Sequence, residues 1–164
     1  IVYELKEFKE RNINALYKNN IIYISPNQDD INDVIDDIIH ELAHSLEEIF
    51  ESKIYYDLSL QSEFLSKRSL LLQNISEDFS IPNSIIEKFR NEMYDSEFDE
   101  FLYKTIGYDV LYEYIDDIFM SPYAITSIRE YFANGFEYFF LKNHKGLKTI
   151  CPILFDKISN LVKK

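Results

Sequence analysis

The stretch DINDVIDDIIHELAHSLEEIFES, from Asp30 to Ser52, contains the pentapeptide His40-Glu41-Leu42-Ala43-His44. On a helix, with about 100° between successive residues, positions i and i+4 point within ~40° of each other. His40 and His44 would therefore project from one face as neighbours, with Glu41 at the edge of that face. The spacing is that of a pair of metal ligands with an adjacent general base.

The flanking residues predict the helix that this arrangement needs. Asp29 or Asp30 can cap its first turn, and Asp33 adds a favourable charge near its N-terminus. We expect the helix to end near Glu51 or Ser52. Apolar residues recur at helical spacing and define one stripe, with the two histidines roughly opposite: Ile31, Ile35, Ile38, Leu42, Leu46 and Ile49.

Two neutral imidazoles suit a zinc ion, which in hydrolytic sites takes three protein ligands and keeps the fourth position for water. Glu41 is placed to accept a proton from that water. The alternative is a solvated acidic helix that happens to carry two histidines. The chain has only three histidines, so this pattern has a low chance of arising by accident, and the sequence favours a site for one Zn²⁺ ion at His40 and His44.

Composition limits the fold and the partners. The 164 residues fit a single domain, 1–164, and a hydrophobic fraction of 46% is enough for a folded core. The net charge of −12 argues against nucleic acid or an anionic membrane as partner. Cys151 is the only cysteine, which excludes a disulfide within the chain, and we expect it to be a small core residue. No apolar run reaches the ~18 residues of a membrane span.

The remaining segments predict an α+β fold that is predominantly helical, with a small sheet. Ile21-Ile22-Tyr23-Ile24 is a β-branched and aromatic run bounded by turn residues, which is typical of a buried strand. Apolar spacing predicts helices over 59–74, 83–94 and 108–119. Only three glycines and four prolines leave little room for an all-β plan.

A third zinc ligand must come from elsewhere, and the best candidate segment is SIREYFANGFEYFFL, from Ser127 to Leu141. This helix is hydrophobic nearly all round, yet Glu130 and Glu137 share one face with Asn134 between them. A buried carboxylate needs a partner, and a zinc ion would serve. Arg129, a lysine or a backbone N–H could serve as well, and the spacing alone does not choose between the two glutamates.

The combination of His40-Glu41-Leu42-Ala43-His44 with the later motif Glu130-Tyr131-Phe132-Ala133-Asn134-Gly135-Phe136 resembles gluzincin metalloproteases, in particular the zincin domain of anthrax lethal factor and the bacterial pro-pro endopeptidases. The resemblance implies a zincin fold in which Glu130 is the third zinc ligand. It also implies that Tyr123, seven residues before Glu130, donates to the oxyanion. The alternative for Tyr123 is a packing residue after Pro122.

The resemblance extends upstream, to 14–17 and to 21–25, where such folds pair an edge strand with the extended substrate.

Two features of the chain depart from the resemblance. The chain between His44 and Glu130 is longer than expected, which predicts a helical insertion at about 51–109. That insertion could form a wall of the cleft, an exosite, a contact with another domain, or simply extra packing. Asn134 replaces an acidic residue, so zinc affinity could be lower.

We therefore expect a zinc-dependent endopeptidase with Glu41 and Tyr123 as catalytic residues and His40, His44 and Glu130 as ligands. Its partner would be a protein or peptide substrate. The alternative is a catalytically silent protein that keeps the zincin scaffold for structure or binding, for example a toxin or phage component. The chain starts at Ile1 and not at Met, which suggests a trimmed or processed chain or a domain of a longer protein. A toxin or phage-encoded effector could also depend on a partner for delivery or activation. The resemblance favours a secreted or virion-associated protein, and the lone cysteine is also compatible with the cytoplasm.

Overall fold

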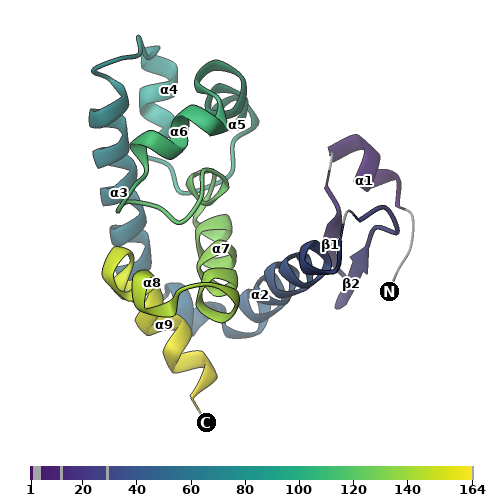
Figure 1. Cartoon of the computed structure of the whole chain (residues 1–164). Helices are drawn as coiled ribbons and strands as arrows, with labels where there is room; N and C mark the ends of the chain where they lie inside the picture. Colours follow the sequence, from purple (N-terminus) through teal and green to yellow (C-terminus); the bar gives the residue numbers. More distant parts are fainter. Residues whose placement is uncertain (2–4, 12, 29, 164) are drawn as a thin grey trace. The chain divides into compact units, whose positions relative to one another are not determined.

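The computed structural model describes residues 1, 5–11, 13–28 and 30–163, which form two compact units, 1–51 and 52–164 (Figure 1). The prediction of a single domain with an insertion at 51–109 stays a prediction. The described chain is predominantly helical with one small antiparallel sheet, which confirms the coarse fold class. Within this part of the chain, no helix combines the length and apolar character that a membrane crossing requires.

The N-terminal unit begins with helix α1 (Lys6–Arg11) and continues as a β-hairpin of β1 (Ala15–Lys18) and β2 (Ile21–Ile24). Asn19 and Asn20 form its two-residue turn with φ values of 53° and 62°. Asparagine tolerates this left-handed conformation, which matches the twist of the paired strands. The predicted strand is confirmed, although most of its residues are only half-buried.

Helix α2 (Ile31–Tyr55) follows the hairpin. Asp30 caps it, because its Oδ1 atom accepts hydrogen bonds from the backbone N–H groups of Asn32 and Asp33 at 2.5 and 3.2 Å. Asp29, the other candidate cap, lies outside the described residues. The helix extends beyond its predicted end, and a non-helical Phe50 (φ −116°, ψ 21°) interrupts it.

The apolar stripe predicted along α2 is largely exposed, with Ile31 and Ile49 each 68% accessible and Leu42 37%. Before the interruption at Phe50, the buried residues of α2 are instead Ala43 and Glu47, which lie on the same helical face as the two histidines. The hydrophobic pattern predicted the helix correctly, because period alone defines an amphipathic helix. It did not predict which face of that helix is buried.

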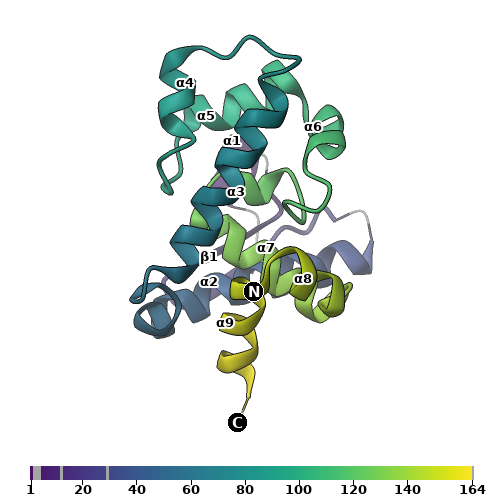
Figure 2. The same cartoon turned by 90° about the vertical axis from the view of Figure 1, so that its left-hand side faces the viewer.

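The C-terminal unit is built on α3 (Ser59–Ile75) and α7 (Ile128–Leu141), which contact each other. Figures 1 and 2 both show one group of short helices at one end of α3 and α8 with α9 at the other. In chain order the other elements are α4 (Asn83–Lys88), α5 (Ser96–Glu100), a π-helix (Phe101–Ile106), α6 (Tyr108–Tyr114), a 3₁₀ turn (Tyr123–Ile125), α8 (His144–Ile150) and α9 (Pro152–Val162).

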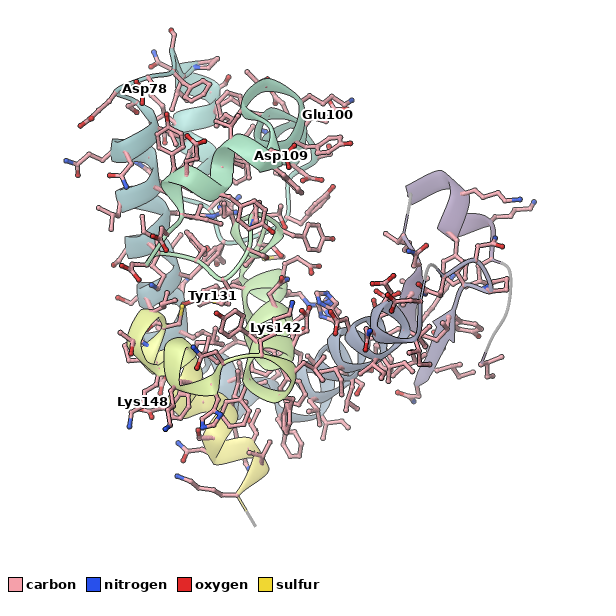
Figure 3. All side chains as sticks on the ribbon, in the orientation of Figure 1. Asp78, Glu100, Asp109, Tyr131, Lys142 and Lys148 are labelled. Atoms are coloured by element: carbon pink, nitrogen blue, oxygen red, sulfur yellow. The ribbon has the colours of Figure 1, made fainter. Side chains whose placement is uncertain are left out.

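The predicted helices over 59–74 and 127–141 are confirmed, whereas those over 83–94 and 108–119 end early. The core between α3 and α7 is aromatic. Tyr131 lies on α7, with its ring centroid 5.3 Å from that of Phe64 on α3 (Figure 3). Gly135 allows α9 to approach α7 closely, since a Cβ atom there would collide with the side chain of Leu154.

Glu63 on α3 caps the neighbouring helix α9. Its two carboxylate oxygens accept hydrogen bonds from the backbone N–H groups of Ile153 and Leu154 at 2.8 and 3.0 Å, and from the Tyr131 hydroxyl at 2.9 Å. The first N–H groups of a helix have no partner inside that helix, so a carboxylate at this end is stabilising. Glu63 thereby links α3, α7 and α9.

We expect Glu63→Ala to lower the free energy of unfolding by about 1–3 kcal/mol, because it leaves two helix N–H groups and a buried hydroxyl without this acceptor. Urea denaturation followed by circular dichroism measures the change. Gln73→Ala, at an exposed position of the same helix, is the matched control and should change stability by less than about 0.5 kcal/mol. Equal effects of the two substitutions would contradict the capping role.

Candidate metal centre

His40 and His44 lie on consecutive turns of α2, as their spacing predicted. Their ring centroids are 5.0 Å apart and the ring planes are inclined by 78°, and both side chains are half-buried. The helix itself fixes this proximity, because residues four apart are neighbours on a helical surface. Two imidazoles held side by side in this way form a bidentate donor set for a transition-metal ion.

Glu47 orients the second histidine. The Nδ1 atom of His44 lies 2.6 Å from Glu47 Oε2, and the Glu47 side chain is only 4% exposed. An acceptor at Nδ1 favours the tautomer that carries its proton there, which directs the lone pair of Nε2 outward. A carboxylate in this position is the usual partner of a histidine that binds a metal.

The Glu41 carboxylate is held by the hairpin. Its Oε2 atom accepts a hydrogen bond from the backbone N–H of Tyr17 at 2.6 Å. Tyr17 pairs with Ile22 at a position of the ladder where its N–H points away from β2, so this N–H is available to another acceptor. The Tyr17 hydroxyl also donates to Glu48 at 2.8 Å, which fixes β1 against α2 a second time.

Glu130 lies in the first turn of α7, where the helix N-terminus stabilises negative charge. Ser127 is the N-cap, and its Oγ atom accepts a hydrogen bond from the Glu130 backbone N–H at 3.2 Å. Ser127-Ile128-Arg129-Glu130 has the sequence of a capping box, in which the glutamate at the fourth position can reach back to the N-cap residue. Glu130 as a whole is half-buried.

Glu137 has a different partner. Its Oε1 atom lies 2.7 Å from the ammonium group of Lys142, which follows the end of the same helix. The sequence left open whether a lysine or a metal would satisfy either glutamate of α7. For Glu137, the structure provides the lysine.

Asn134 connects α7 to the segment before it. Its Oδ1 atom accepts a hydrogen bond from the Ser121 hydroxyl at 2.7 Å, and its Nδ2 atom donates to the Glu130 carbonyl at 2.9 Å. Ser121 Oγ in turn accepts from the Ala124 N–H at 3.2 Å. The amide therefore holds the turn that contains Tyr123.

Tyr123 begins the 3₁₀ turn that precedes α7, and its side chain is half-buried. Its carbonyl accepts a hydrogen bond from the Thr126 hydroxyl at 2.9 Å. Tyr108 is close enough to interact electrostatically with Tyr123, and burial together with Asp99 raises the pKa of Tyr108 well above its usual value. The Tyr108 hydroxyl therefore stays protonated at neutral pH and donates to Asp99 at 3.1 Å.

In the described part of the chain, one group of three side chains brings candidate metal ligands together. His40, His44 and Glu130 each offer one ligand atom, and these atoms lie within 4.8 Å of one another. Two imidazole nitrogens and one carboxylate oxygen are a donor set compatible with a single zinc ion. The three residues are a candidate metal site.

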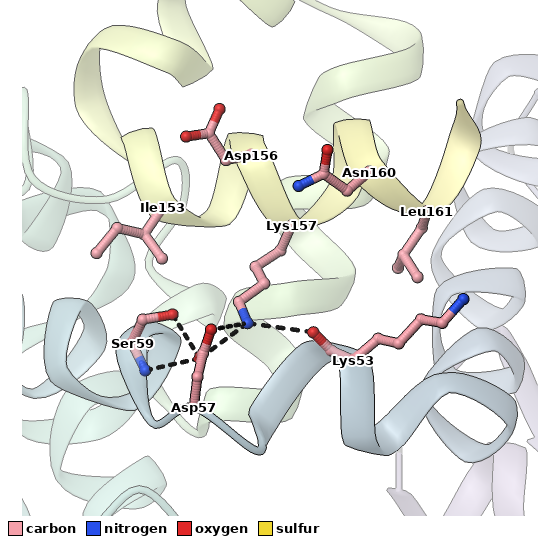
Figure 4. A pocket seen from close by; sticks show the side chains of 8 residues that line it. All are labelled: Lys53, Asp57, Ser59, Ile153, Asp156, Lys157, Asn160 and Leu161. Atoms are coloured by element: carbon pink, nitrogen blue, oxygen red, sulfur yellow. Dashed lines mark hydrogen bonds and ion pairs between the residues drawn. The ribbon is translucent and has the colours of Figure 1, made fainter. Parts of the chain in front are cut away.

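Two other features carry no comparable chemistry. A hollow beside α9 is lined partly by Asp57 and Lys157, which pair with each other at 2.9 Å (Figure 4). Bonds from Ser59 and Lys157 hold the pKa of Asp57 below its usual value. Cys151 is fully buried, as expected, and burial raises the pKa of its thiol to about 11, which keeps it protonated and unreactive. His144 is exposed at the start of α8.

Sequence reasoning did not identify Glu47 and Tyr17 as parts of this centre. Glu47 could have been found, since it follows His44 by three residues and so lies on the same helical face. The Tyr17 N–H has no signature in the sequence, because it depends on how β1 packs against α2. Comparison of the chain with protein-family models, curated proteins and solved structures gives no significant match.

We expect Glu47→Ala to weaken zinc binding by about 10–100-fold, because His44 loses the acceptor that sets its tautomer. Competition with a chromophoric chelator measures the affinity, and circular dichroism checks that α2 remains helical. Glu51→Ala removes an exposed carboxylate from the same helix and controls for the change in net charge. An affinity that is unchanged in Glu47→Ala would show that the contact at Nδ1 has no influence on the metal.

Proposed function

We propose that this protein is a zinc-dependent endopeptidase with a zincin-type catalytic site. The observation that carries the proposal is the grouping of His40, His44 and Glu130, with Glu41 adjacent to the first histidine. A site that serves only to bind metal does not need a carboxylate at that position. Hydrolytic zinc sites need one as a general base.

The donor set fits zinc in a catalytic form. Two imidazoles and one carboxylate are the three protein ligands of many zinc hydrolases, which leave a coordination position open for water. When bound, zinc supplies a Lewis acid that acidifies this water and polarises the substrate carbonyl. Structural zinc sites use four protein ligands, and the group contains three.

Glu41 would take the proton of the attacking water and return it to the leaving amine. Its Oε2 atom is held by the Tyr17 N–H, which leaves Oε1 for the water. This bond fixes the carboxylate without neutralising it. A base in a defined orientation spends less energy on reorganisation when the proton moves.

The Tyr123 hydroxyl would donate a hydrogen bond to the oxyanion that forms as the water attacks. The tight 3₁₀ turn restricts its backbone, and Ser121 and Thr126 brace that turn through hydrogen bonds. A preorganised neutral donor stabilises developing negative charge more than it stabilises the ground state.

The substrate would be an extended peptide that pairs with β2. The Ile22 carbonyl and the Ile24 N–H face away from β1, and both form hydrogen bonds with Ile1, at 2.7 and 2.9 Å. This contact supports the proposal that the outer edge of β2 accepts an extended backbone. The net charge of −12 would favour substrates with basic residues.

Glu41→Ala should abolish cleavage of a peptide library while leaving zinc bound, because it removes the base and none of the ligands. The products are detected by mass spectrometry, and the metal content by elemental analysis of protein purified without added zinc. His40→Ala should lose both zinc binding and peptide cleavage. A wild-type protein that binds zinc stoichiometrically and cleaves no peptide would favour the silent scaffold.

Glu130→Gln should reduce zinc affinity by about tenfold or more while changing thermal stability little. An amide keeps the hydrogen-bonding shape that a capping box needs, and it is a much poorer zinc ligand than a carboxylate. Glu137→Gln on the same helix is the control. Unchanged zinc affinity in Glu130→Gln would exclude Glu130 as a ligand and leave its carboxylate as a helix cap.

A further inference from the structure

Arg68 is a fully buried cation in the middle of α3, with 0% of its surface exposed. Burying an unpaired charge is costly, and a guanidinium carries five N–H donors that all need acceptors. The structure gives it five hydrogen bonds, all of them to backbone carbonyls. Arg68 therefore does not act as half of a side-chain ion pair, and its role is to bind the main chain.

The carbonyls belong to two segments far from α3 in sequence. Nε and the second terminal nitrogen donate to Ile125, and the second also donates to Thr126 at 2.8 Å. The first terminal nitrogen donates to Lys88 at 3.0 Å and to Asn91. A single planar group thus fixes the end of α4 and the turn before α7 at the same time.

Aromatic faces complete the surroundings of the cation. The guanidinium carbon lies 4.6 Å from the ring centroid of Phe64 and 4.5 Å from that of Phe98. These contacts favour a positive charge. Burial lowers the pKa of Arg68 to about 9, so the group remains charged at neutral pH, and the negative charge of Glu92 counteracts this shift.

The carbonyls of Ile125 and Thr126 lie within the short segment that connects Tyr123 to the N-cap Ser127. A further hydrogen bond holds the same segment, since the Ile128 N–H donates to the Glu92 carbonyl at 2.8 Å. The backbone at 123–128, termed here the 123–128 corner, is thereby clamped to α3 and to the chain after α4.

We propose that Arg68 is a positioning residue that holds the 123–128 corner, and with it Tyr123, in the geometry that catalysis needs. The inference rests on the proposed function and adds to it a residue from outside the recognised motifs. It also gives the predicted insertion at 51–109 a role, because Arg68 and both of its other carbonyl partners lie inside it. The insertion would then support the catalytic site through the backbone of the 123–128 corner.

The test compares Arg68→Lys with Arg68→Met. Lysine keeps the charge but has three donors on one nitrogen, so it cannot span the carbonyls of both segments. Methionine replaces the charge with an apolar chain of similar length, which avoids a buried unpaired cation. Arg90→Lys, at an exposed arginine that pairs with Glu87, is the matched control.

The kinetic readout uses the peptide that the wild type cleaves best in the library. We expect kcat to fall about 10²-fold in both Arg68 variants with KM within about twofold, because a displaced oxyanion donor affects mainly the transition state. Combining either variant with Tyr123→Phe should lower kcat little further than Tyr123→Phe does alone, since both changes remove the same interaction. A purely structural role predicts instead that the two losses multiply.

A second readout needs neither metal nor activity. The ring signals of ¹³C-labelled tyrosines report on local geometry, and Tyr123→Phe assigns the signal of Tyr123. We expect this signal to shift in the Arg68 variants and to stay unchanged in Arg90→Lys.

If the wild type cleaves no peptide, the proposed function fails. The Tyr123 ring signal then still tests whether Arg68 positions Tyr123. An unmoved Tyr123 signal, multiplying kinetic losses, or failure of both Arg68 variants to fold would each overturn the proposal.

Discussion

The C-terminal unit depends on one electrostatic constraint, which is that the buried charge of Arg68 has to be satisfied completely. A guanidinium without water can remain charged only if acceptors surround it in its own plane. Backbone carbonyl groups can accept these hydrogen bonds without a second ion. They must come from segments outside α3, because the carbonyls of α3 bind within their own helix. The hydrogen bonds that stabilise the buried cation therefore also fix two other segments of the chain against α3.

The same principle operates along the rest of α3. Glu63 binds N–H groups at the start of α9, and the Lys67 ammonium donates to the carbonyls of Ile118 and Ile150 at 2.8 and 2.7 Å. Three charged side chains on one helix thus bind main-chain groups of other segments, most of them at helix ends or in turns. The 3₁₀ turn of this unit, for example, is held from outside by the bonds of Arg68 to the carbonyls of Ile125 and Thr126.

These long-range bonds explain which parts of the fold the sequence could predict. The histidine pair, the strand over 21–24 and the helix over 127–141 follow from local spacing, so they were predicted. Helix α4 ends at Lys88, short of its predicted end, and the carbonyls of Lys88 and of Asn91 beyond it accept hydrogen bonds from Arg68.

Helix α6 stops at Tyr114, and the chain after it turns through Asp117 at a φ of 58° before the Ile118 carbonyl meets Lys67. In both places a remote cation binds backbone carbonyls at or just beyond the end of a helix. A single sequence gives no signal for such a bond, because the acceptors are backbone atoms that every residue has.

The candidate site likewise contains residues that local spacing predicts and a residue, Glu130, that it does not define alone. His40, Glu41 and His44 are set by one helix, so their spacing defines them. Glu130 has two competing demands, since the position that a zincin-like site assigns to a ligand is also the fourth position of a capping box.

The two roles are compatible in placement, because the N-cap bond from Ser127 fixes the backbone of Glu130 and both roles need that backbone in the first turn of α7. They differ only in where the carboxylate points. The helix N-terminus stabilises the ionised form in either orientation, and an ionised carboxylate is what a zinc ion requires. A capping sequence can therefore position Glu130 as a candidate ligand before any metal binds, because the start of the helix already fixes its backbone.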